Sequence, residues 1–167
     1  MGKSLPKQAI LVVNAGSRKG ADLFAEARDK LIAAGIELLA AKKCKTTKSM
    51  ETEVKQALKK APMVIVGGGD GSLSSFVDYF IGTDVVFALL PLGTANSFAR
   101  TMGVPLDLDG AVDVIAKGEA REIDVGCING DYFLNAAAMG LAPKVAESVP
   151  HGLKRTLGRL GYLIWAG

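Results

Sequence analysis

Short apolar runs alternate along the first 120 residues with segments whose apolar residues recur at helical spacing. Such runs predict buried strands, because the strands of a parallel sheet are covered on both faces and read as continuous hydrophobic stretches. The runs occupy residues 9–13, 36–41, 63–66 and 85–90. Their alternation with helices predicts an α/β fold, an open and mainly parallel sheet with helices on both faces.

The segments between the runs predict the helices. We expect one helix from about Phe24 to a stop at Gly35, one over residues 49–60, one carrying Leu73, Phe76, Val77 and Phe80, a short one over residues 97–100, and one capped by Asp109.

The pattern changes near residue 120. Residues 121–128 and 131–138 flank Asn129-Gly130, a pair that favours the tight type I′ turn of a hairpin. Helical spacing returns at residues 153–164. A hairpin needs further strands or a packing partner, so we expect an α/β domain over residues 1–120, followed at 121–167 by the hairpin and helix that open a truncated, β-rich second domain.

Composition narrows the function classes. Hydrophobic residues make up 49% of the chain and charged residues 22%, which indicates a folded core. A net charge of +3 is too small to indicate nucleic-acid binding. Two isolated cysteines and one histidine exclude zinc sites and disulfide scaffolds. The sequence shows neither a signal peptide nor a membrane-spanning run, so we expect a cytoplasmic protein. Lysines cluster at residues 42–48, and this cluster is either a solvated face or a surface attracted to anionic membranes.

Three polar loops follow predicted strands, at residues 14–20, 67–72 and 93–96. The carboxyl ends of parallel strands meet at one edge of a sheet, where open α/β sheets bind ligands. The loops carry glycines, amide side chains, hydroxyls and Arg18, an inventory suited to a polyphosphate. Asp70 stands out, because a carboxylate repels phosphate unless it serves a metal ion or removes a proton. The P-loop and dinucleotide fingerprints are both absent.

The segments 68–72 and 91–100 resemble the two signature segments of the diacylglycerol kinase catalytic domain family. That family includes bacterial lipid kinases, sphingosine and ceramide kinases and, more distantly, NAD kinases. The resemblance extends over residues 13–17, 122–126, 132–135 and 158–162. It implies an ATP-dependent lipid kinase that uses Mg²⁺ and transfers the γ-phosphate to the hydroxyl of a diacylglycerol-like lipid.

By position, the resemblance makes Asp70 the residue that activates the lipid hydroxyl or organises magnesium, with the other metal ligands in the missing domain. Thr46 or Thr47 matches an ATP-contacting threonine, and the sequence does not choose between them. The remaining nucleotide contacts that it implies are Asn14, Ala15, Gly16, Ser17, Arg18, Gly67, Gly68, Gly69, Gly71, Ser72, Gly93, Thr94 and Asn96.

Some positions depart from the family pattern. Ser74 and Ser75 replace a pair that in the family often ends in glutamate. Pro143 and Lys144 stand where sphingosine kinases carry an aspartate, which favours a neutral acylglycerol or an anionic lipid over a cationic amine.

Family members run to about twice this length, so we expect little or no kinase activity from these residues alone. We also expect self-association through exposed apolar surface of the truncated second domain. A location at the periphery of the membrane is compatible with the expected lipid substrate. Alternatives to the lipid kinase are an NAD kinase-like enzyme and a non-catalytic nucleotide-binding module.

Overall fold

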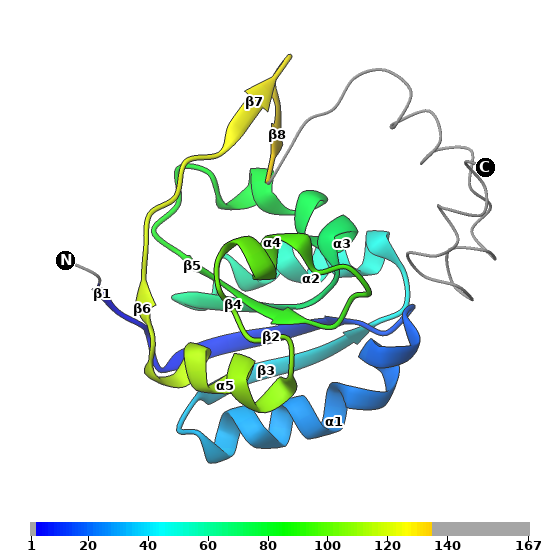
Figure 1. Ribbon diagram of the computed structural model, residues 1–167, viewed down its shortest axis with the longest axis vertical. Coiled ribbons are helices and arrows are strands. Elements are labelled where there is room, and N and C mark those ends of the chain that lie inside the picture. Colours follow the sequence, from blue (N-terminus) through cyan, green and yellow to red (C-terminus); the bar gives the residue numbers. More distant parts are fainter. Residues whose placement is uncertain (1–2, 135–167) are drawn as a thin grey trace. The chain divides into compact units, whose positions relative to one another are not determined.

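The computed structural model describes residues 3–134, in which four parallel strands form the central sheet. The strand order is β3-β2-β4-β5, and the strands are β2 (Gln8–Asn14), β3 (Glu37–Cys44), β4 (Met63–Gly68) and β5 (Val86–Pro91) (Figure 1). The predicted parallel α/β sheet is thereby confirmed. All six residues of β4 are buried, as expected for a central strand covered on both faces.

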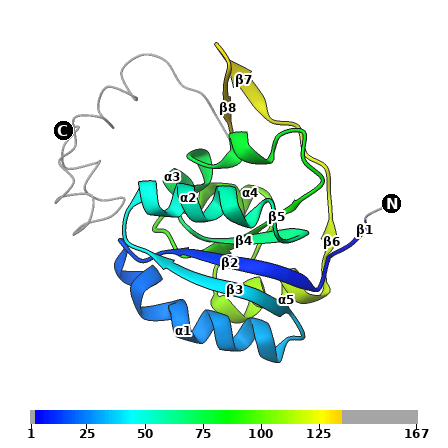
Figure 2. The same cartoon turned by 180° about the vertical axis from the view of Figure 1, so that it is seen from behind.

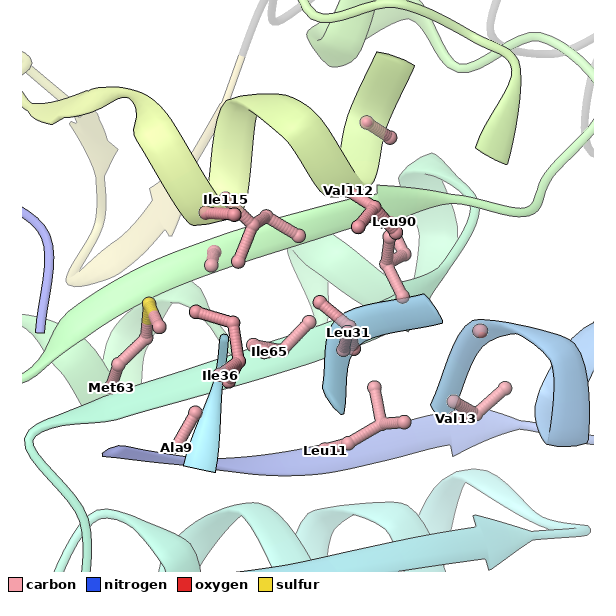
Figure 3. Close-up of a cluster of buried hydrophobic side chains, with 14 of the residues drawn as sticks. Ala9, Leu11, Val13, Leu31, Ile36, Met63, Ile65, Leu90, Val112 and Ile115 are labelled. Carbon is pink, nitrogen blue, oxygen red and sulfur yellow. The ribbon is translucent and has the colours of Figure 1, made fainter. Parts of the chain in front are cut away.

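Helices cover both faces of the sheet, as the two opposite views show (Figures 1 and 2). One face carries α1 (Arg18–Ala33) and α5 (Leu108–Lys117). The other carries α2 (Thr47–Ala57), α3 (Asp70–Ser74), the 3₁₀ helix η1 (Val77–Phe80) and α4 (Ser97–Thr101). Successive residues of β2 serve the two faces in turn, because side chains alternate along a strand. Ala9, Leu11 and Val13 pack under α1 and α5 (Figure 3), whereas Ile10 and Val12 pack under α2.

Helix boundaries follow local hydrogen bonds. Gly35 adopts φ 87° just after α1 and ends it as predicted, because glycine reaches the left-handed region without strain. The helix expected over residues 49–60 instead spans Thr47–Ala57. It starts earlier because Thr46 and Ser49 form a reciprocal capping box.

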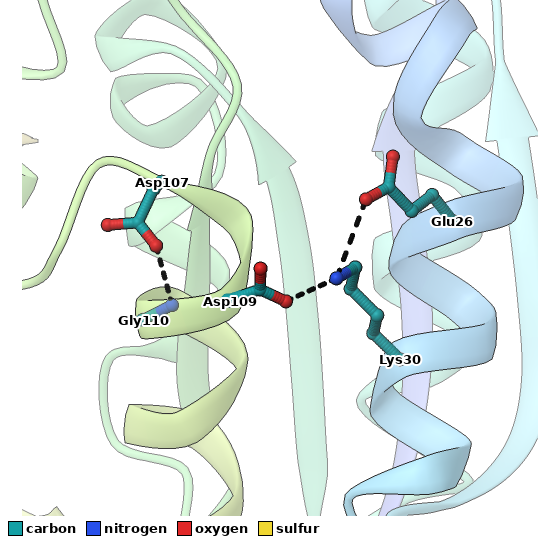
Figure 4. Close-up of polar contacts among 5 residues, drawn as sticks. All are labelled: Glu26, Lys30, Asp107, Asp109 and Gly110. Carbon is teal, nitrogen blue, oxygen red and sulfur yellow. Dashed lines mark hydrogen bonds and ion pairs between the residues drawn. The ribbon is translucent and has the colours of Figure 1, made fainter.

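Two helix predictions were wrong. Asp107, not Asp109, caps α5 by accepting a hydrogen bond from the Gly110 N–H at 2.8 Å, while Asp109 in the first turn pairs with Lys30 of α1 (Figure 4). The single helix expected at Leu73, Phe76, Val77 and Phe80 is broken into α3 and η1. Its apolar residues nevertheless face the core: Leu73, Phe76 and Val77 are buried.

The segment after α5 forms short antiparallel pairs. β6 (Glu119–Ala120) pairs with β1 (Lys3–Ser4), a contact that the sequence pattern did not predict. β7 (Gly126–Ile128) and β8 (Asp131–Phe133) form the predicted hairpin with shorter strands. Asn129 and Gly130 have φ angles of 53° and 91°, as a type I′ turn requires.

The hairpin belongs to the same compact unit as the sheet, Met1–Leu134, and β8 contacts η1. The domain division at residue 120 stays a prediction. Residues 135–138 and the predicted helix at 153–164 lie outside the described residues. Among the helices of residues 3–134, none combines the length and the apolar character needed to cross a bilayer.

Candidate active site

Three loops meet at the carboxyl edge of the sheet, as the sequence predicted. They are the Asn14 loop (residues 14–17), the Asp70 turn (residues 67–72) and the Asn96 loop (residues 91–98). The strand register brings them together, since Val13 lies opposite Gly67 and Gly68 lies opposite Pro91. Gly67 and Gly68, the first two residues of the predicted turn, belong to the end of β4.

Asn14 ties its own loop to the Asp70 turn. Its side-chain amide donates a hydrogen bond to the Ser72 hydroxyl at 3.0 Å, and its side-chain oxygen accepts one from the Gly16 N–H at 3.0 Å. The Ala15 N–H donates to the Cys44 carbonyl at 2.7 Å, which attaches the loop to the end of β3. The Asn14 loop is therefore held on two sides before any ligand binds.

Asp70 links the Asp70 turn to the Asn96 loop across 27 and 28 residues of sequence. Its two carboxylate oxygens accept hydrogen bonds from the backbone N–H groups of Ser97 and Phe98, each at 3.0 Å. These N–H groups open α4 and have no carbonyl partner within that helix. Asp70 thus caps α4 from a distance, and the two donors offset part of its negative charge.

Each carboxylate oxygen of Asp70 can accept more than one hydrogen bond, and the residue is partly exposed. The carboxylate therefore retains capacity for a hydroxyl group or a cation. Among the described residues no group of three or more His, Cys, Asp or Glu side chains could hold a metal ion. A magnesium ion often uses only one or two carboxylates plus substrate phosphates, so Asp70 fits such an ion as a single protein ligand.

Asn96 shapes its own loop. It occupies the N-cap position of α4 with φ 49°, and its side chain turns away from that helix. Its oxygen accepts from the Gly93 N–H at 2.9 Å, and its amide donates to the Pro91 and Gly93 carbonyls at 3.2 and 2.9 Å. Because the residue is only 5% exposed and these contacts engage its polar atoms, a nucleotide contact through the Asn96 side chain stays a prediction.

The glycines at the site differ in what they are needed for. A Cβ on Gly93 would lie 2.4 Å from the Gly69 Cα, and one on Gly69 would lie 2.9 Å from the Gly93 Cα. A Cβ on Gly68 would lie 2.8 Å from the Ser72 side chain. Gly69 and Gly93 therefore let the Asp70 turn and the Asn96 loop touch, and Gly68 leaves room for Ser72 within the Asp70 turn. Gly71 is different, because a Cβ there would meet no atom of the protein within 4 Å.

The other predicted contacts also cluster at this edge. Ser17 caps α1, accepting from the Gly20 N–H at 3.1 Å, and Arg18 begins that helix. Thr46 uses its hydroxyl in the capping box of α2, and Thr47 is exposed in the first turn. Thr94 is exposed in the Asn96 loop. The residues that sequence reasoning missed are Ser97 and Phe98, which act through backbone N–H groups and carry no side-chain signal for that role.

Cys44 lies beside the Asn14 loop but offers no nucleophile. Its side chain is buried. Burial raises the pKa of the Cys44 thiol above its ordinary value. A protonated thiol is a poor nucleophile, so the polar chemistry of the site rests on Asp70 and the loop amides.

Comparison with known proteins agrees with this geometry. The family described as "Diacylglycerol kinase catalytic domain" matches residues 8–128. A diacylglycerol kinase from Bacillus subtilis is 38% identical over 111 residues, which cover 65% of this chain and 37% of that protein. A protein named "Probable lipid kinase YegS-like" from Pseudomonas aeruginosa is 40% identical over 103 residues, covering 60% of this chain and 34% of that protein.

Among solved structures, a diacylglycerol kinase from Bacillus anthracis matches with a TM-score of 0.69 and 28% identity. That match covers 80% of this chain and 52% of the solved chain. The chain spans about a third of the length of the two relatives from Bacillus subtilis and Pseudomonas aeruginosa. The loops at the sheet edge fall within the matched residues, and the chain belongs to the diacylglycerol kinase catalytic domain family.

Proposed function

We propose that this chain is the nucleotide-binding part of an ATP-dependent lipid kinase, which transfers the γ-phosphate of ATP to the hydroxyl of a diacylglycerol-like lipid. Family membership and the names of the relatives support this proposal. The observation that carries it is the carboxylate of Asp70, held at 3.0 Å by two N–H groups of α4 beside the open face of Gly71.

Phosphoryl transfer needs alignment of the reactants and neutralisation of charge rather than covalent catalysis. In the proposed reaction the lipid oxygen bonds to the γ-phosphorus while the bond from phosphorus to the bridging oxygen of ADP breaks. The hydroxyl proton passes to Asp70, whose second oxygen stays hydrogen-bonded to α4. The backbone amides of the Asp70 turn and the Asn96 loop would bind phosphate oxygens, with Gly71 leaving room for close approach.

Magnesium, when bound, would offset the charge of the phosphates. Asp70 is the described side chain that would hold it, and further ligands are expected from the phosphates themselves. The five-residue helix α3 is too short to supply a strong dipole. In the proposed site, phosphate oxygens would therefore be bound by individual amide groups and cations.

A binding experiment tests the nucleotide half of the proposal. A ligand that binds only the folded state raises its stability, by about 2.7 kcal/mol at a concentration one hundred times Kd. We expect ATP with Mg²⁺ to raise the melting temperature of this chain, and NAD or acidic lipid to do so less. A larger shift with NAD would favour the NAD kinase-like alternative, and no shift with any ligand would contradict the proposal.

Changing Asp70 to Asn tests the catalytic half. In a protein that carries this sequence and has measurable turnover, loss of the proton acceptor should lower kcat about 100-fold or more. Asparagine keeps one hydrogen-bond acceptor, so ATP binding should survive in part. Asp78→Asn is the matched control, since Asp78 is exposed on η1 and away from the loops. Near-normal turnover of the Asp70 variant would contradict the assignment.

One observation favours a non-catalytic nucleotide-binding module as the second candidate. Ser75 stands where the family pattern resembled by this sequence often has a glutamate; it is exposed, and its hydroxyl donates to the Gly71 carbonyl at 2.9 Å. ATP binding without any phosphoryl transfer would support that candidate. Cytoplasmic location, action on lipid at a membrane surface and self-association remain parts of the proposal.

A further inference from the structure

An apolar cavity of about 150 Å³ lies between η1, β5, α4 and the segment that leads into and out of the hairpin. All of its lining side chains are apolar: Val77, Phe80, Ile81, Phe87, Phe98, Ile123, Val125 and Leu134. A space of this volume accepts a hydrocarbon of about six carbon atoms, such as benzene. The occupant that suits it is a hydrocarbon chain, because the lining offers no side-chain hydrogen bond.

Phe98 connects this cavity with the candidate active site. Phe98 lines the cavity, and its backbone N–H donates to the Asp70 carboxylate at 3.0 Å. The cavity and the proposed proton acceptor therefore lie at two ends of one residue. A molecule with a hydroxyl at Asp70 and a hydrocarbon chain in the cavity would occupy two adjoining sites on this chain.

The cavity reaches the protein surface at two isoleucines. Ile81 is 38% exposed and Ile123 is 42% exposed, and both line it. A chain can enter from solvent or from a lipid surface without unfolding the sheet. From these observations we propose that the cavity binds the first carbons of the substrate's hydrocarbon chain, a role that rests on the lipid-kinase function proposed above.

Binding of alkanols of increasing length tests the proposal on the whole chain. Each methylene transferred from water into the cavity should tighten binding about fourfold. The affinity of 1-alkanols should therefore rise from butanol to about hexanol and then level off, once the cavity is filled. NMR titration locates the bound alkanol through shifts of the Ile81, Val125 and Phe98 signals.

Two tryptophan variants make the test specific. Ile123→Trp places a large side chain at the mouth of the cavity and should weaken hexanol binding at least tenfold. Ile128→Trp is the matched control, since Ile128 is 50% exposed in the same segment and does not line the cavity. Ile81→Ala is a second variant that widens the mouth and should move the plateau to alkanols about three carbons longer, the number of carbons removed.

ATP–Mg²⁺ binding, measured on the same samples, separates the two proposals. Chain-length-dependent binding that Ile123→Trp abolishes, with ATP binding intact, supports the inference. ATP binding without alkanol binding would mean that protein fills the cavity, either residues of this chain or a second copy, and would overturn it. Alkanol binding that neither the Ile123 nor the Ile81 variant alters would overturn it as well. Alkanol binding without ATP binding would contradict the proposed function and leave an apolar site unrelated to a kinase.

Discussion

The layer formed by α1 and α5 and the loop cluster at the carboxyl edge are held together by different forces. In the layer, amphipathic helices of 16 and 10 residues bury Leu31, Val112 and Ile115 against the sheet. The ion pair between Lys30 and Asp109 that joins the two helices is exposed and contributes little. In the loop cluster, helices of five residues depend on the hydrogen bonds that Asp70 accepts and Asn14 donates, and on the Gly69–Gly93 contact.

The difference leads us to expect that substitutions in the two regions affect stability and ligand binding to different degrees. The layer is stabilised by the burial of apolar surface, to which many side chains contribute. The loop cluster depends on single atoms at fixed positions, so under the proposed function we expect its loss to lower nucleotide affinity more than it lowers stability. Three substitutions test this contrast, and a fourth tests an ion pair that lies outside both regions.

Leu31→Ala should have the largest effect on stability. Leu31 is fully buried, and truncating such a leucine costs about 2–5 kcal/mol of unfolding free energy. The folded fraction should still bind ATP–Mg²⁺ with its Kd changed less than about twofold, because Leu31 lies near the end of α1 that is opposite to the Asn14 loop. Urea unfolding and calorimetry measure the two quantities. Ile32→Ala, on the same helix but 53% exposed, should change stability by less than about 0.5 kcal/mol. A strong loss of affinity in the Leu31 variant would mean that the two regions are coupled.

Gly93→Ala should lower both the free energy of unfolding and the affinity for ATP–Mg²⁺. The new methyl group would meet the Gly69 backbone, which cannot move aside as a flexible side chain does. Such overpacking costs about 1–3 kcal/mol, and we expect ATP–Mg²⁺ affinity to fall more than tenfold because two phosphate-facing loops separate. Unchanged affinity in this variant would show that their close approach is not needed for the ligand.

Gly71→Ala should raise the stability of the fold and lower its affinity for ATP–Mg²⁺. No protein atom lies within 4 Å of the added Cβ, and replacing such a helical glycine stabilises by about 0.4–1 kcal/mol. ATP–Mg²⁺ binding should nevertheless weaken, since the methyl group would stand where the phosphates approach. Thermal unfolding with and without the nucleotide measures both effects in one series. A variant that is more stable and binds ATP normally would contradict the assignment of Gly71.

Glu51→Gln should have the smallest effect. Hydrogen bonds from Lys55 of the same helix and from the Tyr79 hydroxyl of η1, at 2.7 and 2.8 Å, hold the pKa of the Glu51 carboxyl below its ordinary value of 4.5. A lowered folded-state pKa stabilises the protein above pH 4.5, and that stabilisation disappears as the pH falls through the lowered pKa. The melting temperature of the variant should therefore lie slightly below that of the parent at pH 7 and match it at the acid end. A difference that grows toward acid pH would contradict this sign.

Local sequence determined much of this protein. Apolar runs placed the four strands, and the Asn129-Gly130 pair placed the turn of the hairpin, because both signals act over a few residues. The alternation of strands and helices was sufficient to predict the parallel sheet and the edge at which its loops meet.

Tertiary structure decided the rest. The cap that Asp70 provides to α4 joins residues 27 and 28 positions apart, and no local pattern carries such a contact. Phe76, with φ −125°, interrupts the helix between α3 and η1, a break that the helical spacing of the buried residues did not indicate. The sequence does not distinguish Gly93 from Gly71, yet a Cβ on Gly93 would meet the backbone of Gly69, whereas a Cβ on Gly71 would point into open space. Short-range propensity selects elements, but only the packing of distant segments sets which atoms lie within reach of one another.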